Sequence, residues 1–278
     1  MAHDINFNEQ TNQHSFFSVK EKPWYGLGQI VEQYPNSADA LRFAGLDYTV
    51  GKLPNKHVLP SGKEVISSSS FFTYRLDNEE VLGDSVGRDY EIVQNTDAFN
   101  FFDAIVGGEG IMYETAGALG KGERIFITAK LPGYIKVGGD DLIEKYLFLA
   151  TSHDGFGSIT AAFTPTRIVC RNTLNAAFKN CSNSIKIRHT QNAKERLEQA
   201  HKVMGITNTL SHSLESAFNN WAKVRITDRQ VKKLIQLVMI PNREVLQNIQ
   251  AGKDDDLSTC FKNMCDNVFE YAQTSPTQ

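Results

Sequence analysis

Hydrophobic and polar residues follow two different patterns in the two parts of the chain. Up to about residue 163, short runs rich in Val, Ile, Phe, Thr and Tyr are separated by turns containing Gly, Pro, Asn or Asp. Such runs are typical of β-strands. The predicted strands are 47–52, 64–76, 79–87, 89–95, 111–118, 124–131, 134–137, 145–152 and 158–163. Because the turns between them are short, we expect an antiparallel sheet.

Helical periodicity is confined to short stretches of this first part and dominates the second. The predicted helices are 37–44, 96–106, 172–179, 193–206, 207–224, 227–240 and 257–273. Thr227 or Asp228 is a suitable N-cap for the 227–240 helix, and Pro241 ends it. The sequence therefore predicts an α+β fold, in which an antiparallel β-rich N-terminal domain is followed by a helical C-terminal region.

The same patterns suggest where the chain divides. Residues 1–22 show no hydrophobic periodicity, which predicts a flexible arm. Residues 23–192 then form the α+β core domain, and residues 193–278 form the helical region. The N-terminus is polar without an apolar signal segment, and no window approaches the ~20 apolar residues that span a bilayer. We expect a soluble, cytoplasmic protein that has no membrane partner.

Charge is distributed unevenly along the chain. The net charge is −3, yet residues 160–203 contain eight Lys and Arg against two Asp and Glu. Residues 1–118 show the opposite balance, with eight basic and 17 acidic residues. A basic segment in a mildly acidic protein indicates a surface for a polyanion, while pairing of these cations with the acidic half is the alternative.

The segment 164–190 combines this charge with amides and hydroxyls. Arg offers planar, bidentate donors to phosphate, and Asn or Thr adds neutral donors of the kind that contact nucleic-acid backbones. Arg167 and Arg171 share a face if the segment is helical. The predicted nucleic-acid-binding residues are Arg167, Arg171, Asn172, Thr173, Lys179, Lys186, Arg188 and His189.

Catalytic and metal chemistry find less support in the sequence. The four Cys form no CxxC pair, so we expect reduced thiols, no metal site and no cofactor. His153-Asp154-Gly155 is consistent with an Asp-Gly turn, since no nucleophile motif accompanies it. An enzyme acting on nucleotides or nucleic acid, with His153, Asp154 and His189 as acid–base groups, is the alternative.

Several separated motifs resemble one family of proteins. They are WYGLG at 24–28, ALRFAGLDYTV at 40–50, YEIVQNTDAF at 90–99, SHDG at 152–155, TPTRIVCRNTL at 164–174 and RHT at 188–190. Together they resemble a phage/plasmid-like family that carries a domain of unknown function, over roughly residues 15–205. The resemblance implies a setting among replication and recombination genes. Single-strand annealing proteins, which form oligomeric rings around a basic groove, are a fold-level analogy.

These observations favour a non-enzymatic protein that binds or anneals single-stranded DNA. The apolar stripes of the predicted C-terminal helices indicate a homo-oligomer, because a lone helical appendage cannot bury that much apolar surface. An interaction or assembly protein, in which the basic segment pairs with the acidic half, is a further alternative.

Overall fold

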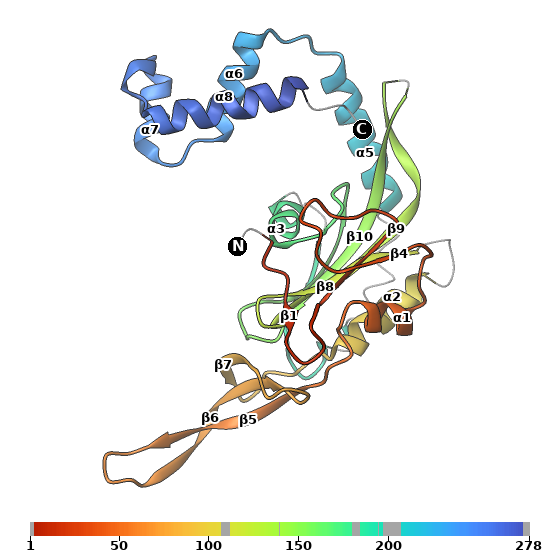
Figure 1. Cartoon of the computed structure of the whole chain (residues 1–278), viewed down its shortest axis with the longest axis vertical. Helices are drawn as coiled ribbons and strands as arrows, with labels where there is room; N and C mark the ends of the chain where they lie inside the picture. Colours follow the sequence, from red (N-terminus) through yellow and green to blue (C-terminus); the bar gives the residue numbers. More distant parts are fainter. Residues whose placement is uncertain are drawn as a thin grey trace. The chain divides into compact units, whose positions relative to one another are not determined.

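The computed structural model describes residues 3–106, 112–138, 140–179, 184–193, 195–196 and 207–274 (Figure 1). Two compact units are present, one formed by 1–135 with 142–214 and the other by 136–141 with 215–278. The first unit contains the sheets and the second is helical apart from residues 136–141. This confirms the α+β class, and the C-terminal part of the second unit begins at residue 215.

A seven-stranded sheet forms the centre of the first unit. Its strand order is β12-β11-β10-β9-β8-β3-β4. The strands are β3 (Phe16–Val19), β4 (Gln29–Val31), β8 (Met112–Leu119), β9 (Arg124–Val137), β10 (Asp141–Ser152), β11 (Ile159–Thr164) and β12 (Ser184–Ile187). The pairs β3–β8, β8–β9, β10–β11 and β11–β12 are antiparallel, as expected, whereas β3 and β4 run parallel.

Helices cover both faces of this sheet. On one face lie α1 (Ser37–Phe43) and α2 (Asn95–Val106), where Phe43 packs on Phe17 with ring centroids 6.4 Å apart. On the other face α3 (Arg171–Lys179) packs on Phe16 and Phe148. Since strands between two helical layers are buried on both sides, they read as continuous apolar runs without alternation.

A second sheet holds β5 (Val50–Val58), β6 (Glu64–Arg75) and β7 (Val81–Gly87). β5 and β6 pair out to Val58 and Glu64, but β7 contacts β6 only from Ser70 to Tyr74. The outer part of the β5–β6 hairpin is therefore two-stranded, and Figure 1 shows it projecting from the three-stranded part. A small ribbon of β1 (Phe7–Asn8) and β2 (Gln13–His14) lies near the N-terminus.

Three local predictions differ from the structure. Residues 1–22 are not a flexible arm, because they contain β3 with fully buried Phe16 and Phe17; burial on both faces removes the periodicity that would reveal a strand. The predicted strand 89–95 is irregular up to residue 94, where α2 follows, and its Tyr90 hydroxyl donates to the Ser152 carbonyl at 2.9 Å. The expected turn at residues 132–133 lies inside β9, where Gly133 adopts a φ of 73°.

The C-terminal unit has a small core of its own. It contains α6 (Asp228–Val238), α7 (Arg243–Gln250) and α8 (Thr259–Thr274), while α5 (Thr207–Ala222) spans the division between the units. Its buried residues are Ile235, Ile249, Leu257, Phe261 and Cys265. Thr227 caps α6 in a capping box with Gln230, which confirms the expected start. α7 was not predicted, and most of the expected helix 193–206 lies outside the described residues.

Candidate nucleic-acid interface

The basic segment folds into a loop, the helix α3 and the edge strand β12. Leu174 and Ala177 are the buried side of α3, and Asn172, Asn175 and Lys179 form its exposed stripe at helical spacing. The Thr173 hydroxyl accepts from the backbone nitrogens of Val169 at 2.9 Å and Cys170 at 3.0 Å. Thr173 therefore stabilises the start of α3 and is not free to contact a ligand.

Arg167 is held by the fold. Its side chain is 17% exposed and pairs with Glu114 at 2.7 Å and Glu21 at 2.9 Å. Further donors reach the Ser18 hydroxyl and the Val19 carbonyl, both at 2.9 Å. These bonds attach the loop before α3 to the end of β3, so we remove Arg167 from the predicted phosphate contacts.

Glu114, which the sequence reasoning missed, is the buried partner in this cluster. It lies in β8 where the register with β9 shifts between Tyr113 and Thr115, a β-bulge that re-aims a side chain. Burial raises the pKa of Glu114, against the opposing effect of the Arg167 guanidinium. The sequence did contain a signal, since Glu114 is the one acidic residue among the mostly apolar residues 112–119. An ionised carboxylate is rarely buried without a partner, so an acid in such a strand indicates an ion pair.

His189 is also part of the interior. Its ring stacks on Tyr90 with centroids 4.9 Å apart, and its two nitrogens lie 3.1 Å from the Thr151 hydroxyl and the Glu91 carbonyl. Burial lowers the pKa of His189, so the ring is neutral at physiological pH. Because a buried neutral imidazole carries no charge that attracts a phosphate, we also remove His189 from the predicted phosphate contacts.

Arg171 is intermediate between these cases. Its guanidinium pairs with Asp4 at 2.9 Å, but the side chain is 41% exposed. For this residue, the alternative interpretation holds: a cation of the basic segment is neutralised by an acid of the N-terminal half. An exposed ion pair of this kind contributes little stability and leaves Arg171 accessible at the start of α3.

The remaining cations form the surface that we call the basic face: Arg124, Lys179, Lys186 and Arg188. Lys179, Lys186 and Arg188 are exposed, and Arg124 is half-buried. None of the four forms an ion pair with any residue that the structure describes. Unpaired cations attract an anion more strongly than cations that are already neutralised by carboxylates.

The register of the sheet explains why these residues lie on one side. Lys186 pairs with Thr160, which pairs with Ala150 on the face covered by α3. Arg188 follows Lys186 by two residues and so belongs to the same side. Arg124 pairs with Leu119, another residue of the core under α3. Arg124 lies outside the basic segment, and only the strand pairing brings it to this face.

A pocket of about 210 Å³ lies on the basic face. Arg124 and Lys186 line it together with Phe178 of α3. The other lining residues are Ala150, Thr151, Ser152, Gly157, Ser158 and Thr160, most of which carry hydroxyl groups. The two cations are the donors that a phosphate group requires, whereas the Thr151 and Ser152 hydroxyls already bond His189 and Asp154.

His153 and Asp154 have structural roles in the neighbouring turn. The His153 ring is fully buried, with its Nε2 2.9 Å from Asn95 Oδ1, and burial lowers its pKa to about 3. Asp154 Oδ1 accepts from the Ser152 hydroxyl at 2.7 Å and from the Phe156 nitrogen at 2.9 Å. The Asp-Gly turn is as predicted, and a ring held neutral and away from solvent is unsuited to acid–base catalysis.

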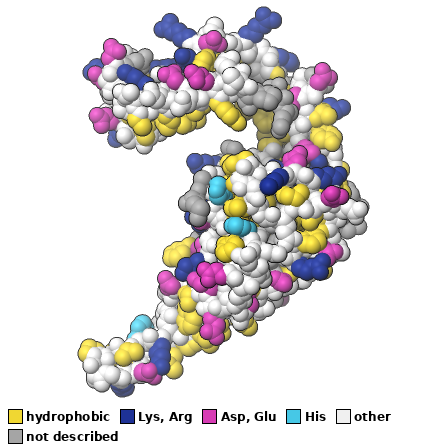
Figure 2. Space-filling view, in the orientation of Figure 1, with side chains coloured by type: hydrophobic (Ala, Val, Ile, Leu, Met, Phe, Trp, Pro, Cys, Tyr) yellow, Lys and Arg dark blue, Asp and Glu magenta, His cyan; other side chains and the backbone are white. Residues whose placement is uncertain are grey.

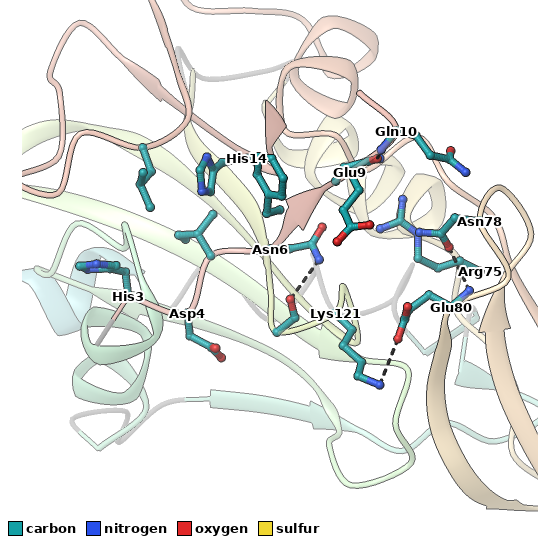
Figure 3. A pocket seen from close by; sticks show the side chains of 15 residues that line it. His3, Asp4, Asn6, Glu9, Gln10, His14, Arg75, Asn78, Glu80 and Lys121 are labelled. Atoms are coloured by element: carbon teal, nitrogen blue, oxygen red, sulfur yellow. Dashed lines mark hydrogen bonds and ion pairs between the residues drawn. The ribbon is translucent and has the colours of Figure 1, made fainter. Parts of the chain in front are cut away.

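A larger pocket, of about 720 Å³, lies between the N-terminal strands and the turns after β6 and β8 (Figure 3). Lys121 forms an ion pair across it with Glu80 at 3.0 Å, and Asn6 donates to the Gly120 carbonyl at 3.0 Å. Three acidic and two basic side chains line this pocket, so it offers no net positive charge to a polyanion.

In the described part of the chain, no three His, Cys, Asp or Glu side chains are grouped as a bound metal ion would require. No helix in the same residues is both long and apolar enough to cross a bilayer.

The fold and the basic face define an α+β protein that presents, beside the edge strand β12, cations without an ion-pair partner among the described residues. The family model described as a domain of unknown function, DUF932, matches residues 83–277, and the chain belongs to this family. The matched region begins in β7 and includes residues of both compact units. No curated protein and no solved structure matches the chain significantly.

Proposed function

We propose that the protein binds nucleic acid through the basic face, with single-stranded DNA as its main ligand and annealing of strands in replication or recombination as its role. The observation that supports this is the absence of any described acidic partner for Arg124, Lys179, Lys186 and Arg188. Asn172 and Asn175, exposed on α3, add neutral donors for the backbone. The resemblance to phage/plasmid-like proteins supports a mobile genetic element as the setting.

Equilibrium binding of labelled oligonucleotides at several salt concentrations tests the proposal. Four phosphate contacts give a slope of log affinity against log salt of roughly −3 for a single strand. Affinity should thus fall about 50-fold between 50 and 200 mM salt. The annealing rate of two complementary labelled strands, measured with and without protein, tests the finer role.

Variants decide whether the basic face carries this binding. Lys179→Gln combined with Arg188→Gln should weaken binding and bring the slope to about −1.4, since each lost contact removes about 0.7. Lys63→Gln, in the turn of the β5–β6 hairpin, is the matched control for one lost charge. Failure of the protein to bind any oligonucleotide at 50 mM salt would refute the proposal, as would metal-dependent turnover of the strand.

Self-assembly is a second candidate function, favoured by the C-terminal unit. Figure 2 shows hydrophobic side chains gathered along one side of its helices. The exposed large hydrophobic residues of α6 are Leu234, Leu237 and Val238. Val238 is 73% exposed and Trp221 of α5 is 67% exposed. Exposed apolar surface of this kind marks an interaction site in many proteins.

A further inference from the structure

The loop 153–157 carries an aromatic side chain that the fold itself does not use. Phe156 is 89% exposed, the highest value among the large hydrophobic side chains that the structure describes. No hydrophobic cluster or ring contact of the described residues includes it. Exposing a Phe ring to water costs free energy, so the exposure of Phe156 needs an explanation.

The loop is held in one conformation. Asp154 Oδ1 binds both the Ser152 hydroxyl and the Phe156 nitrogen, and the His153 nitrogen donates to the Glu123 carbonyl at 2.6 Å. The loop also packs on β7, where a Cβ on Gly83 would lie 2.7 Å from the Asp154 Cα. Phe156 is therefore presented to solvent from a fixed backbone.

This fixed loop is also a wall of the pocket on the basic face. Ser152, just before the loop, and Gly157, its last residue, line the pocket, so Phe156 directly precedes a lining residue in the chain. A Cβ on Gly157 would come within 2.3 Å of Ser152 Oγ, so the close approach of the loop to β10 depends on this glycine. The hydrogen bond from His153 to the residue before Arg124 links the loop to the cationic side.

We infer that this pocket holds one nucleotide of a bound single strand, with its phosphate between Arg124 and Lys186 and its base stacked on Phe156. The inference rests on the proposed function and adds to it the position and chemistry of one subsite. Cations beside an exposed aromatic ring are how many proteins hold single strands, because every base offers a π-face. Asp154 forms no ion pair with Arg124 or Lys186, and its Oδ1 accepts two hydrogen bonds within the loop.

The stacking part predicts a difference between single strands and duplexes. Phe156→Ala should weaken single-strand binding about 10-fold and leave the salt slope unchanged, because the ring carries no charge. Duplex affinity should stay within about twofold, since paired bases are already stacked on each other. Phe156→Trp should restore binding. The exposed ring makes no contact that stabilises the fold, so the melting temperature should not move.

The proposed phosphate contacts of Arg124 and Lys186 predict a change in the salt slope, which the Phe156 variant should leave unchanged. Arg124→Gln and Lys186→Gln should each lower the salt slope for single strands by about 0.7.

Oligonucleotides that contain 5-bromouracil provide an independent measurement of the stacked base: after irradiation, the peptide attached to them should contain Phe156. Melting curves of each variant confirm that it is folded.

The outcomes separate this inference from the proposed function. If the wild type binds no oligonucleotide, both fail. If Lys179→Gln with Arg188→Gln weakens binding while the Phe156, Arg124 and Lys186 variants do not, only the subsite is wrong. Equal losses for single strands and duplexes with Phe156→Ala would also overturn it. So would binding of free dTMP that depends on Phe156 while oligonucleotide affinity does not.

Discussion

Replacement of Arg167 by Ala tests whether this residue serves the fold or a ligand. In the wild type the guanidinium lies 2.7 Å from the buried Glu114 and also bonds Glu21, Ser18 and Val19. The variant leaves the Glu114 carboxylate buried without its partner, which costs about 3–5 kcal/mol. The pair with Glu21 adds little, because the Glu21 side chain is 75% exposed. We therefore expect the free energy of unfolding to fall by about 4 kcal/mol.

The assay is urea unfolding at pH 7 together with oligonucleotide binding on the same preparation. For a unit of this size the loss corresponds to a melting temperature lower by about 10 °C. Arg171→Ala, which removes the half-exposed pair with Asp4, is the control and should cost under about 1 kcal/mol. Combining Arg167→Ala with Glu114→Gln should cost less than the sum of the single variants, since the two residues share one interaction.

The pH dependence gives a second readout of the same interaction. Without Arg167 the pKa of Glu114 rises further, so the folded variant takes up a proton more readily than the unfolded chain. Its deficit relative to the wild type should shrink as the pH falls from 7 to 5. An unchanged unfolding free energy accompanied by a lower salt slope would refute this reasoning and return Arg167 to the interface.

Three further predictions concern acid stability, loop packing and assembly. The folded His153 stays neutral down to a pKa of about 3, whereas the unfolded residue gains a proton below about 6.5. Urea unfolding between pH 7.5 and 5 measures this effect. The free energy of unfolding should be constant above pH 6.5 and fall by up to about 1.4 kcal/mol per pH unit below it. A free energy that stays constant over the whole range would contradict this prediction. Gly83→Ala should destabilise by about 1–3 kcal/mol in thermal melts, because its Cβ would strike the Asp154 backbone, while Gly87→Ala in the same strand meets nothing within 4 Å and should not. Light scattering should show the full chain self-associated and Leu234→Glu with Val238→Glu smaller; a monomeric wild type would exclude assembly through this surface.

Patterns within one element were readable from the sequence. Short runs of β-formers with tight turns determined the antiparallel pairing of β8 with β9 and β10 with β11, and the cap candidates Thr227 and Asp228 determined the start of α6. The charge count alone located the segment 160–203, which contains three of the four cations of the basic face. These signals depend on neighbours a few residues apart, which the sequence displays directly.

Contacts between distant residues decided the rest. Arg167 and Lys186 belong to the same basic segment, yet one is paired inside the fold and the other exposed, because Glu114 and Glu21 lie 53 and 146 residues before Arg167. Arg124 joins Lys186 only through the order of the strands. β3 was hidden for a related reason, since helices on both faces of the sheet bury its residues in succession. Local patterns record which element a residue belongs to, but the charge that a side chain shows to solvent depends on what the fold places against it.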